Sequence, residues 1–83
     1  MANVILYSKN GCHLCEVARE TLEKIRQEFP FSLTEIDIEK DRTIFEKYKY
    51  LIPVIEIDGE PVFKYRINEA EFKRILESKS QPR

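Results

Sequence analysis

The first part of the chain shows two successive patterns of apolar residues. Residues 3–8 hold four consecutive apolar side chains, a run that is too short for a helix and predicts a buried parallel strand. After a break at residues 9–11, apolar positions recur every three or four residues from Cys12 until Pro30 ends the pattern. This spacing predicts an amphipathic helix of about five turns.

A second strand and a short helix are predicted next. Residues 31–38 mostly alternate between apolar and polar side chains, but the apolar positions change phase near Glu35, where we expect an irregularity in the strand. Apolar residues at helical spacing follow within residues 44–48, and Asp41 is placed to cap the amino end of this helix. We expect the helix to end near Tyr50.

The dipeptide Asp58-Gly59 separates two further runs of alternating residues, 54–57 and 60–65. Asp-Gly is a strong signal for a two-residue hairpin turn, so the two strands should pair antiparallel. Pro61 and Lys64 in the second strand are typical of a sheet edge, because proline lacks a backbone donor and lysine discourages pairing with another chain.

A last helix is predicted from its cap and its apolar stripe. Asn68 followed by Glu71 resembles a capping box, and apolar residues at helical spacing follow within residues 72–76. The remaining residues show no apolar pattern, so we place one domain over residues 1–78 and a flexible tail over residues 79–83.

The predicted order is strand, helix, strand, helix, strand, strand, helix. A helix between the first two strands implies a right-handed parallel crossover, whereas the hairpin makes the last two strands antiparallel. The chain is therefore expected to form an α/β fold with a mixed four-stranded sheet and three helices. Ligands in such sheets bind beyond the carboxyl ends of the parallel strands, and residues 10–15 lie there.

Composition and charge exclude several classes of partner. The chain has 83 residues, 42% of them hydrophobic, and its 14 basic and 15 acidic residues give a net charge of -1. With nearly equal numbers of basic and acidic residues, the chain lacks the excess positive charge that binds nucleic acid or an anionic membrane, so we expect neither partner. No apolar run approaches the roughly 18 residues of a transmembrane helix, and residues 1–7 do not resemble a leader. We expect a soluble, cytoplasmic monomer.

Both cysteines of the chain, Cys12 and Cys15, lie at the predicted start of the first helix. Positions three apart share one side of a helical turn, so the two thiols can form a small disulfide ring. A ring this short stabilises a fold little, which favours a chemical role over a structural one. Unpaired N–H groups and the helix dipole stabilise a thiolate at this position, so Cys12 is the expected nucleophile and the more buried Cys15 its partner.

Two stretches of the sequence resemble the signatures of glutaredoxins. Residues 7–15 are similar to the active-site stretch of that family, and residues 51–59 are similar to its second signature around a cis-proline. The resemblance extends from Asn3 to Leu76 and is closest to the short glutaredoxin-like proteins. It implies the thioredoxin fold in its minimal βαβαββα form and a thiol–disulfide oxidoreductase in which Cys12 attacks and Cys15 resolves the mixed disulfide.

The resemblance also implies residues that bind substrate. A cis bond before Pro53 would aim the backbone of Ile52 at the cysteines, where an extended substrate could pair with it. Lys9 matches a lysine that contacts a glutathione carboxylate in glutaredoxins. His13 could tune the thiolate or carry a proton, which follows from its place between the cysteines and not from the resemblance. Read without the resemblance, these residues would be a trans proline, a solvated lysine and an exposed residue at a helix start.

The sequence departs from the family pattern after the hairpin. Glutaredoxins carry two glycines there, whereas this chain has the bulky residues Lys64 and Tyr65. We therefore expect no tightly bound cofactor, and glutathione dependence is in doubt. The expected substrates are protein or small-molecule disulfides, with glutathione or a thioredoxin-reductase-type system as electron donor.

Two alternatives from other classes stay open. A metal or iron–sulfur carrier could use Cys12, Cys15 and His13, but a closed zinc site needs about four ligands and so would require a partner or a dimer. We expect no metal site within the chain alone. A non-catalytic thioredoxin-fold binding module could instead use the sheet edge or the proline groove.

Overall fold

The computed structural model describes residues 1–80 and contains the predicted elements in the predicted order. They are β1 (Asn3–Ser8), α1 (His13–Glu28), β2 (Ser32–Asp37), a 3₁₀ turn η1 (Ile38–Lys40), α2 (Arg42–Tyr48), β3 (Val54–Ile57), β4 (Glu60–Lys64) and α3 (Glu69–Ser80). Among these residues, no helix is long and apolar enough to span a bilayer.

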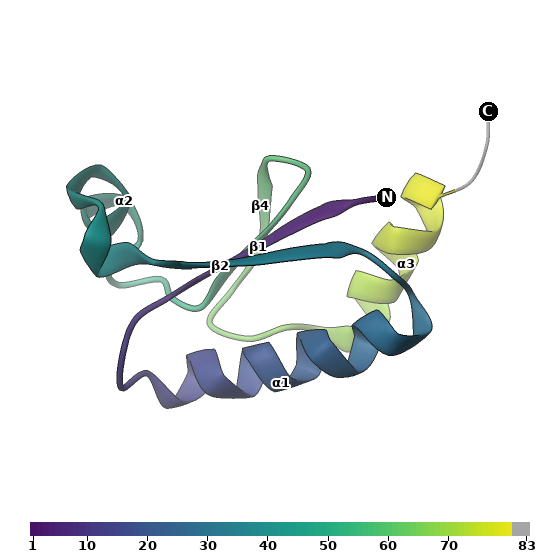
Figure 1. Cartoon of the computed structure of the whole chain (residues 1–83), viewed down its shortest axis with the longest axis horizontal. Helices are drawn as coiled ribbons and strands as arrows, with labels where there is room; N and C mark the ends of the chain where they lie inside the picture. The colour runs from purple at the N-terminus through teal and green to yellow at the C-terminus, as the bar shows by residue number, and fades with distance from the viewer. Residues whose placement is uncertain (81–83) are drawn as a thin grey trace.

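The four strands form one mixed sheet in the order β2-β1-β3-β4 (Figure 1). The two central strands, β1 and β3, run antiparallel, while β1 and β2 are parallel as the helical crossover requires. β4 pairs antiparallel with β3 and lies at the edge, which confirms the position predicted from Pro61 and Lys64.

Each face of the sheet carries its own hydrophobic core. Helices α1 and α3 cover one face, where Leu6, Leu22 and Phe72 are fully buried and the Phe31 and Phe72 rings meet edge to face with centroids 5.4 Å apart. On the opposite face, Tyr7 and Val54 of the sheet pack against Ile38 of η1 and Tyr48 of α2. Burying each large side chain contributes about 1.5–3 kcal/mol, so the two cores hold the helices on the sheet.

Strand β2 is regular, which corrects the irregularity expected near Glu35. Its pairing with β1 continues without a break from Ser32 to Asp37. The apolar pattern changes phase because Glu35, a charged residue, occupies the α1 face of the strand, where it binds Arg19. Leu33 packs against the core on that same face, whereas Ile36 packs against the other core.

The hairpin turn has the backbone that its sequence predicted. Asp58 and Gly59 have φ angles of 51° and 90°, and positive values at both central residues are typical of a type I′ turn. A one-residue shift in register follows between the pairs Ile55–Phe63 and Glu56–Pro61. The irregularity of the sheet therefore lies in the β3–β4 pair.

The predicted caps of the two later helices are confirmed. Asp41 Oδ1 accepts a hydrogen bond from the Ile44 backbone N–H at 3.0 Å, and Asn68 Oδ1 accepts one from Glu71 N–H at 2.9 Å. Helix α3 continues to Ser80, two residues beyond the expected domain end at residue 78. The rest of the expected tail, residues 81–83, lies outside the described part of the chain.

Candidate functional site

One end of the sheet collects the segments that carry the candidate chemistry. Tyr7 near the end of β1 pairs with Val54 at the start of β3, and Val54 pairs with Lys64 at the end of β4. The turn into α1, the loop from α2 to β3 and the loop from β4 to α3 therefore share this end (Figure 1). The two cysteines follow β1 directly.

The turn from β1 into α1 depends on Gly11. Its φ angle is +78°, a left-handed conformation that glycine adopts without the penalty of a side chain. An added Cβ would meet no heavy atom within 4 Å, so the requirement is conformational and not steric. The Cys12 N–H then donates to the Lys9 carbonyl at 3.3 Å, which closes the turn ahead of the helix.

Cys12 is the N-cap residue of α1. Its backbone is extended, and its Sγ accepts a hydrogen bond from the Cys15 backbone N–H at 3.2 Å. The helix itself begins at His13, one residue later than the apolar pattern predicted. The sulfur thus occupies the place of the side-chain oxygen that usually caps a helix, where a negative charge is stabilised by N–H groups and the helix dipole.

The two cysteines form a disulfide, so the structure represents the oxidised chain. Their Cα atoms are 5.2 Å apart, within the range that disulfides require. Cys12 is partly exposed, whereas Cys15 is fully buried beneath the helix. This difference agrees with the expected roles, because only the more accessible sulfur can be reached by a second molecule.

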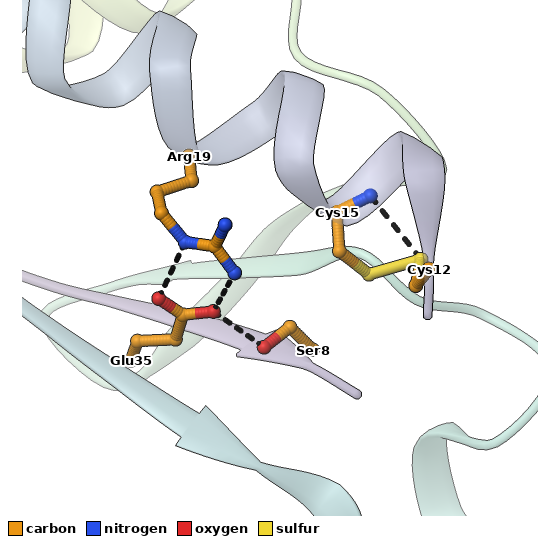
Figure 2. A network of polar contacts seen from close by, with 5 residues as sticks. All are labelled: Ser8, Cys12, Cys15, Arg19 and Glu35. Carbon is orange, nitrogen blue, oxygen red and sulfur yellow. Dashed lines mark hydrogen bonds and ion pairs between the residues drawn. A yellow bond between two sulfur atoms is a disulfide. The ribbon is translucent and has the colours of Figure 1, made fainter. Parts of the chain in front are cut away.

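A polar network lies next to the cysteines on α1, as Figure 2 shows. Two of the three guanidinium nitrogens of Arg19 donate to Glu35, Nε to Oε1 at 2.7 Å and Nη2 to Oε2 at 2.5 Å. Ser8 Oγ donates to the same carboxylate at 2.7 Å, and only 4% of Ser8 is exposed. The network joins the ends of β1 and β2 to α1, one helical turn beyond Cys15.

The charge on Glu35 is held by its partners. The hydrogen bonds from Arg19 are the main cause that lowers the Glu35 pKa below its ordinary value, and the Ser8 hydroxyl adds to the effect. The sequence alone did not predict this network, since Arg19 and Glu35 are 16 positions apart and resemble solvated charges. The available signal was that Cys15 and Arg19, four residues apart, share one face of α1.

The peptide bond between Ile52 and Pro53 is cis, as the resemblance implied. Pro53 is buried at the start of β3, and Ile52 is partly exposed. The Tyr65 backbone N–H donates to the carbonyls of Leu51 at 3.3 Å and Pro53 at 2.9 Å. The loop that follows β4 is thereby fixed to the loop that contains the cis-proline.

The other two candidate residues, Lys9 and His13, lie on the β2 side of β1 and in solvent, respectively. Lys9 borders a shallow hollow of about 270 Å³ together with Ser8, Asn10, Glu35 and Asp37, on the β2 side and not on the proline side. His13 is exposed, and its Nδ1 lies 3.9 Å from Glu16 Oε1. The structure therefore does not bring Lys9 and Pro53 to the same side of the strand.

A second polar cluster is buried under α2. Tyr48 Oη donates to Glu56 Oε2 at 3.0 Å, and the Tyr7 and Tyr48 rings lie with centroids 4.8 Å apart. Burial, and then the hydrogen bond to Glu56, raises the pKa of Tyr48 to about 12. Within residues 1–80, no group of three or more His, Cys, Asp or Glu side chains is arranged to hold a metal ion.

Comparisons with known proteins agree with this geometry. The family model described as Glutaredoxin-like domain (DUF836) matches residues 3–77. A curated glutaredoxin-like protein from Dictyostelium discoideum is 35% identical over 82 residues, an alignment that covers 92% of this chain and 76% of the relative. Both findings extend over almost the whole domain and include both cysteines.

Solved structures show the same fold at lower identity. Protein Ne2328 from Nitrosomonas europaea superposes with a TM-score of 0.81 at 22% identity, covering 90% of this chain and 91% of the other. A mutant thioredoxin from Halobacterium salinarum superposes with a TM-score of 0.73 at 17% identity, covering 99% of this chain and 77% of the other. The chain has the thioredoxin fold, and it belongs to the glutaredoxin-like (DUF836) family.

Proposed function

We propose that the chain is a thiol–disulfide oxidoreductase in which Cys12 is the nucleophile and Cys15 the resolving thiol. Membership of a glutaredoxin-like family with a CxxC pair supports a redox role in general. The finer assignment of the two sulfurs comes from their positions at the start of α1. It goes beyond what the family match states.

One observation carries the proposal: a partly exposed sulfur caps a helix while bonded to a fully buried sulfur. Cys12 Sγ accepts the Cys15 N–H at 3.2 Å, so in the reduced chain a negative sulfur would keep a hydrogen bond and gain the helix dipole. A thiolate stabilised in this way is populated near neutral pH. The buried thiol of Cys15 is shielded from second molecules and can react only with Cys12.

The reaction follows from this arrangement in two exchange steps. The Cys12 thiolate attacks one sulfur of a substrate disulfide, forming a mixed disulfide and releasing the other substrate sulfur as a thiolate. Cys15 then loses its proton and attacks Cys12 Sγ, which releases the second substrate thiolate and forms the Cys12–Cys15 disulfide. Two electrons pass from the chain to the substrate, and the two released thiolates take up two protons. An external dithiol or glutathione returns the electrons.

The proposed substrates are protein or small-molecule disulfides in the cytoplasm. The reductant is either glutathione or a thioredoxin-reductase-type system, and the bulk of Lys64 and Tyr65 favours the second. Ile52 and Pro53 are the proposed backbone contacts for an extended substrate. Lys9 and His13 are secondary candidates for binding, because one faces the β2 side and the other faces solvent.

Reduction of insulin with dithiothreitol as electron source tests the proposal. We expect the wild-type chain to accelerate the reaction and Cys12→Ser to abolish that acceleration, because the nucleophile is lost. Cys15→Ser should instead accumulate a mixed disulfide through Cys12, detected by mass spectrometry. Both variants remove one sulfur from the same ring, so each serves as the other's control for folding.

Two results would contradict the proposal. Wild-type protein without any acceleration would remove the oxidoreductase assignment, as would a Cys12→Ser variant that remains active. Purified protein that carries zinc or iron in stoichiometric amount, bound through the cysteines, would favour the metal-carrier alternative.

A further inference from the structure

Four of the six well-exposed large apolar side chains of the described chain lie at the end of the sheet where α1 begins. Among the described residues, the large apolar side chains that are well exposed are Met1, Leu14, Val17, Tyr50, Val62 and Tyr65. Leu14 and Val17 lie in the first turns of α1, directly after Cys12, and Tyr50 and Tyr65 lie in the two loops next to the cis-proline. Such a concentration around a reactive group is typical of a surface that contacts another molecule.

Unpaired positive charges gather at the same end. Every lysine and arginine of α1 and α3 in the described chain has a carboxylate partner, for example Arg26 with Glu23 and Arg74 with Glu71. The lysines and arginines without an ion pair in residues 1–80 are Lys9, Lys40, Arg42, Lys47, Lys64 and Arg66. They lie after β1, in or just before α2, or at and just after the end of β4, at the end of the sheet that holds the cysteines (Figure 1). Three carboxylates at this end, Asp37, Glu39 and Asp41, also have no ion pair among the described residues.

Tyr65 is held in a conformation that its residue type disfavours. Its φ angle is 72°, and a left-handed backbone costs about 1–2 kcal/mol for a residue with a bulky side chain. The two hydrogen bonds from Tyr65 N–H to the carbonyls of Leu51 and Pro53 maintain it. Tyr65 is 46% exposed, so burial does not explain why a tyrosine is present. Strain of this kind is found at binding sites.

We infer that Lys64, Tyr65 and Arg66, here called the cationic rim, bind a polypeptide disulfide whose cysteine is flanked by carboxylates. This inference rests on the proposed function and adds the substrate class. The two cations provide charge complementarity to acidic side chains, and the Tyr65 ring provides apolar contact area, a combination typical of protein interfaces. Leu14 and Val17 extend the apolar contact beyond the size of a small thiol.

A pair of synthetic peptide disulfides tests the inference on the full chain. The peptides differ only in the residues next to cysteine, which are glutamates in one and lysines in the other. The Cys15→Ser variant holds the reaction at the mixed disulfide, whose rate of formation is measured by acid quenching and mass spectrometry. We expect the acidic peptide to react about tenfold faster at low salt, and the ratio to approach one at about 1 M salt.

Charge reversal identifies the residues responsible. Lys64→Glu with Arg66→Glu, in the Cys15→Ser background, should lower the ratio of acidic to basic rates about tenfold. The matched control is Arg26→Glu with Arg74→Glu, which makes the same change in net charge on α1 and α3, away from the cysteines, and should leave the ratio nearly unchanged. Because both peptides react with the same variant, any effect of the substituted charges on the reactivity of Cys12 cancels in the ratio of the two rates.

The tyrosine is tested separately. Tyr65→Gly should fold at least as well as the parent, since glycine accepts φ of 72° without penalty, and should slow the acidic peptide by roughly threefold or more. Oxidised glutathione, a small disulfide that also carries carboxylates, should react more slowly than the acidic peptide and should not be slowed by this substitution.

The outcomes separate this inference from the proposed function. Equal rates for the two peptides, a ratio that Lys64→Glu with Arg66→Glu leaves unchanged, or glutathione reacting as fast as the acidic peptide would overturn the cationic rim alone. Failure of every disulfide to react with Cys12 would overturn the proposed function and this inference together.

Discussion

Glu35 is the residue that connects α1 to both parallel strands near the cysteines. It accepts two hydrogen bonds from Arg19 and one from Ser8. Ser8 ends β1, so the carboxylate fixes the strand end from which the turn to Cys12 departs. At the scale of single residues, this ion pair holds the start of the site in place, and its hydrogen bonds include neither sulfur.

The substitution Glu35→Gln tests the contribution of this charge. Because the partners lower the Glu35 pKa, the stabilisation is present above the ordinary value of 4.5 and is lost as pH falls below it. With the pair partly exposed, we expect Glu35→Gln to cost about 1 kcal/mol or less at pH 7 and less than that at pH 3. Urea unfolding at the two pH values measures the difference; an equal cost at both would exclude the ionic contribution.

A second prediction concerns Tyr48 and the stability of the fold at alkaline pH. Its pKa in the folded chain is raised to about 12 from 10.0, so stability is fully present below pH 10 and decreases as pH rises toward 12. A shift of this size corresponds to about 2–3 kcal/mol. Tyr48→Phe should show a smaller alkaline decrease, because Tyr7, whose pKa is also raised by burial, still contributes to it. At pH 8 the variant should be less stable by about 1 kcal/mol because Glu56 loses a hydrogen bond.

Tyr50→Phe is the matched control for that substitution. Tyr50 is 80% exposed and lies two residues further along the chain, so removal of its hydroxyl should change neither the stability at pH 8 nor the alkaline decrease. Unfolding curves of Tyr48→Phe that parallel the wild type from pH 8 to pH 11 would contradict the role assigned to the buried hydroxyl.

At the scale of the elements, the turn between β1 and α1 requires a left-handed backbone at Gly11. Gly11→Ala places a side chain on a backbone with φ of +78° but creates no contact within 4 Å. We expect a loss of about 1 kcal/mol, which lowers Tm by about 4–8 °C in a domain of this size. Thermal unfolding followed by circular dichroism measures the shift. Asn10→Ala, at an exposed position of the same turn, is the control; a Tm for Gly11→Ala equal to that of the control would contradict the conformational requirement.

Most elements of the fold could be predicted because each carries a local signal. The Asp58-Gly59 turn, the Asp41 and Asn68 caps and the apolar spacing of α1 are set by neighbours in the sequence. The Ile52–Pro53 cis bond is different, since only the resemblance to a family implied it. Local sequence does not distinguish it from a trans bond.

The polar networks could not be predicted because they depend on tertiary contacts. Glu56 occupies a polar position in an alternating strand, yet β3 is central and buried on both faces, so its carboxylate lies inside the protein beside Tyr48. The contact of Arg19 with Glu35 likewise requires the register of β2 against β1 and the rotation of α1. Neither the strand register nor the rotation of the helix can be read from local sequence patterns.

Across the whole molecule, charge and apolar exposure are distributed unevenly. Ion pairs tie the lysines and arginines of α1 and α3 to nearby carboxylates, whereas unpaired cations and exposed aromatic rings surround the end of the sheet that carries Cys12. Carboxylates without an ion pair, Asp37, Glu39 and Asp41, lie at the same end between β2 and α2, so the cations there form local patches and not a uniformly positive surface. Lys64 and Arg66 are both exposed and have no ion pair among the described residues, so their charges are available to an acidic partner.

The reactivity of Cys12 in the reduced chain is the property on which the proposed chemistry depends. Its rate of alkylation by iodoacetamide, measured from pH 4 to pH 10 with peptide mapping to separate the two cysteines, gives the thiolate pKa directly. We expect a pKa at least one unit below the roughly 8.5 of a free cysteine, with Cys15 reacting far more slowly. A Cys12 pKa at or above 8.5, or a Cys15 that reacts first, would contradict the assignment of Cys12 as the nucleophile.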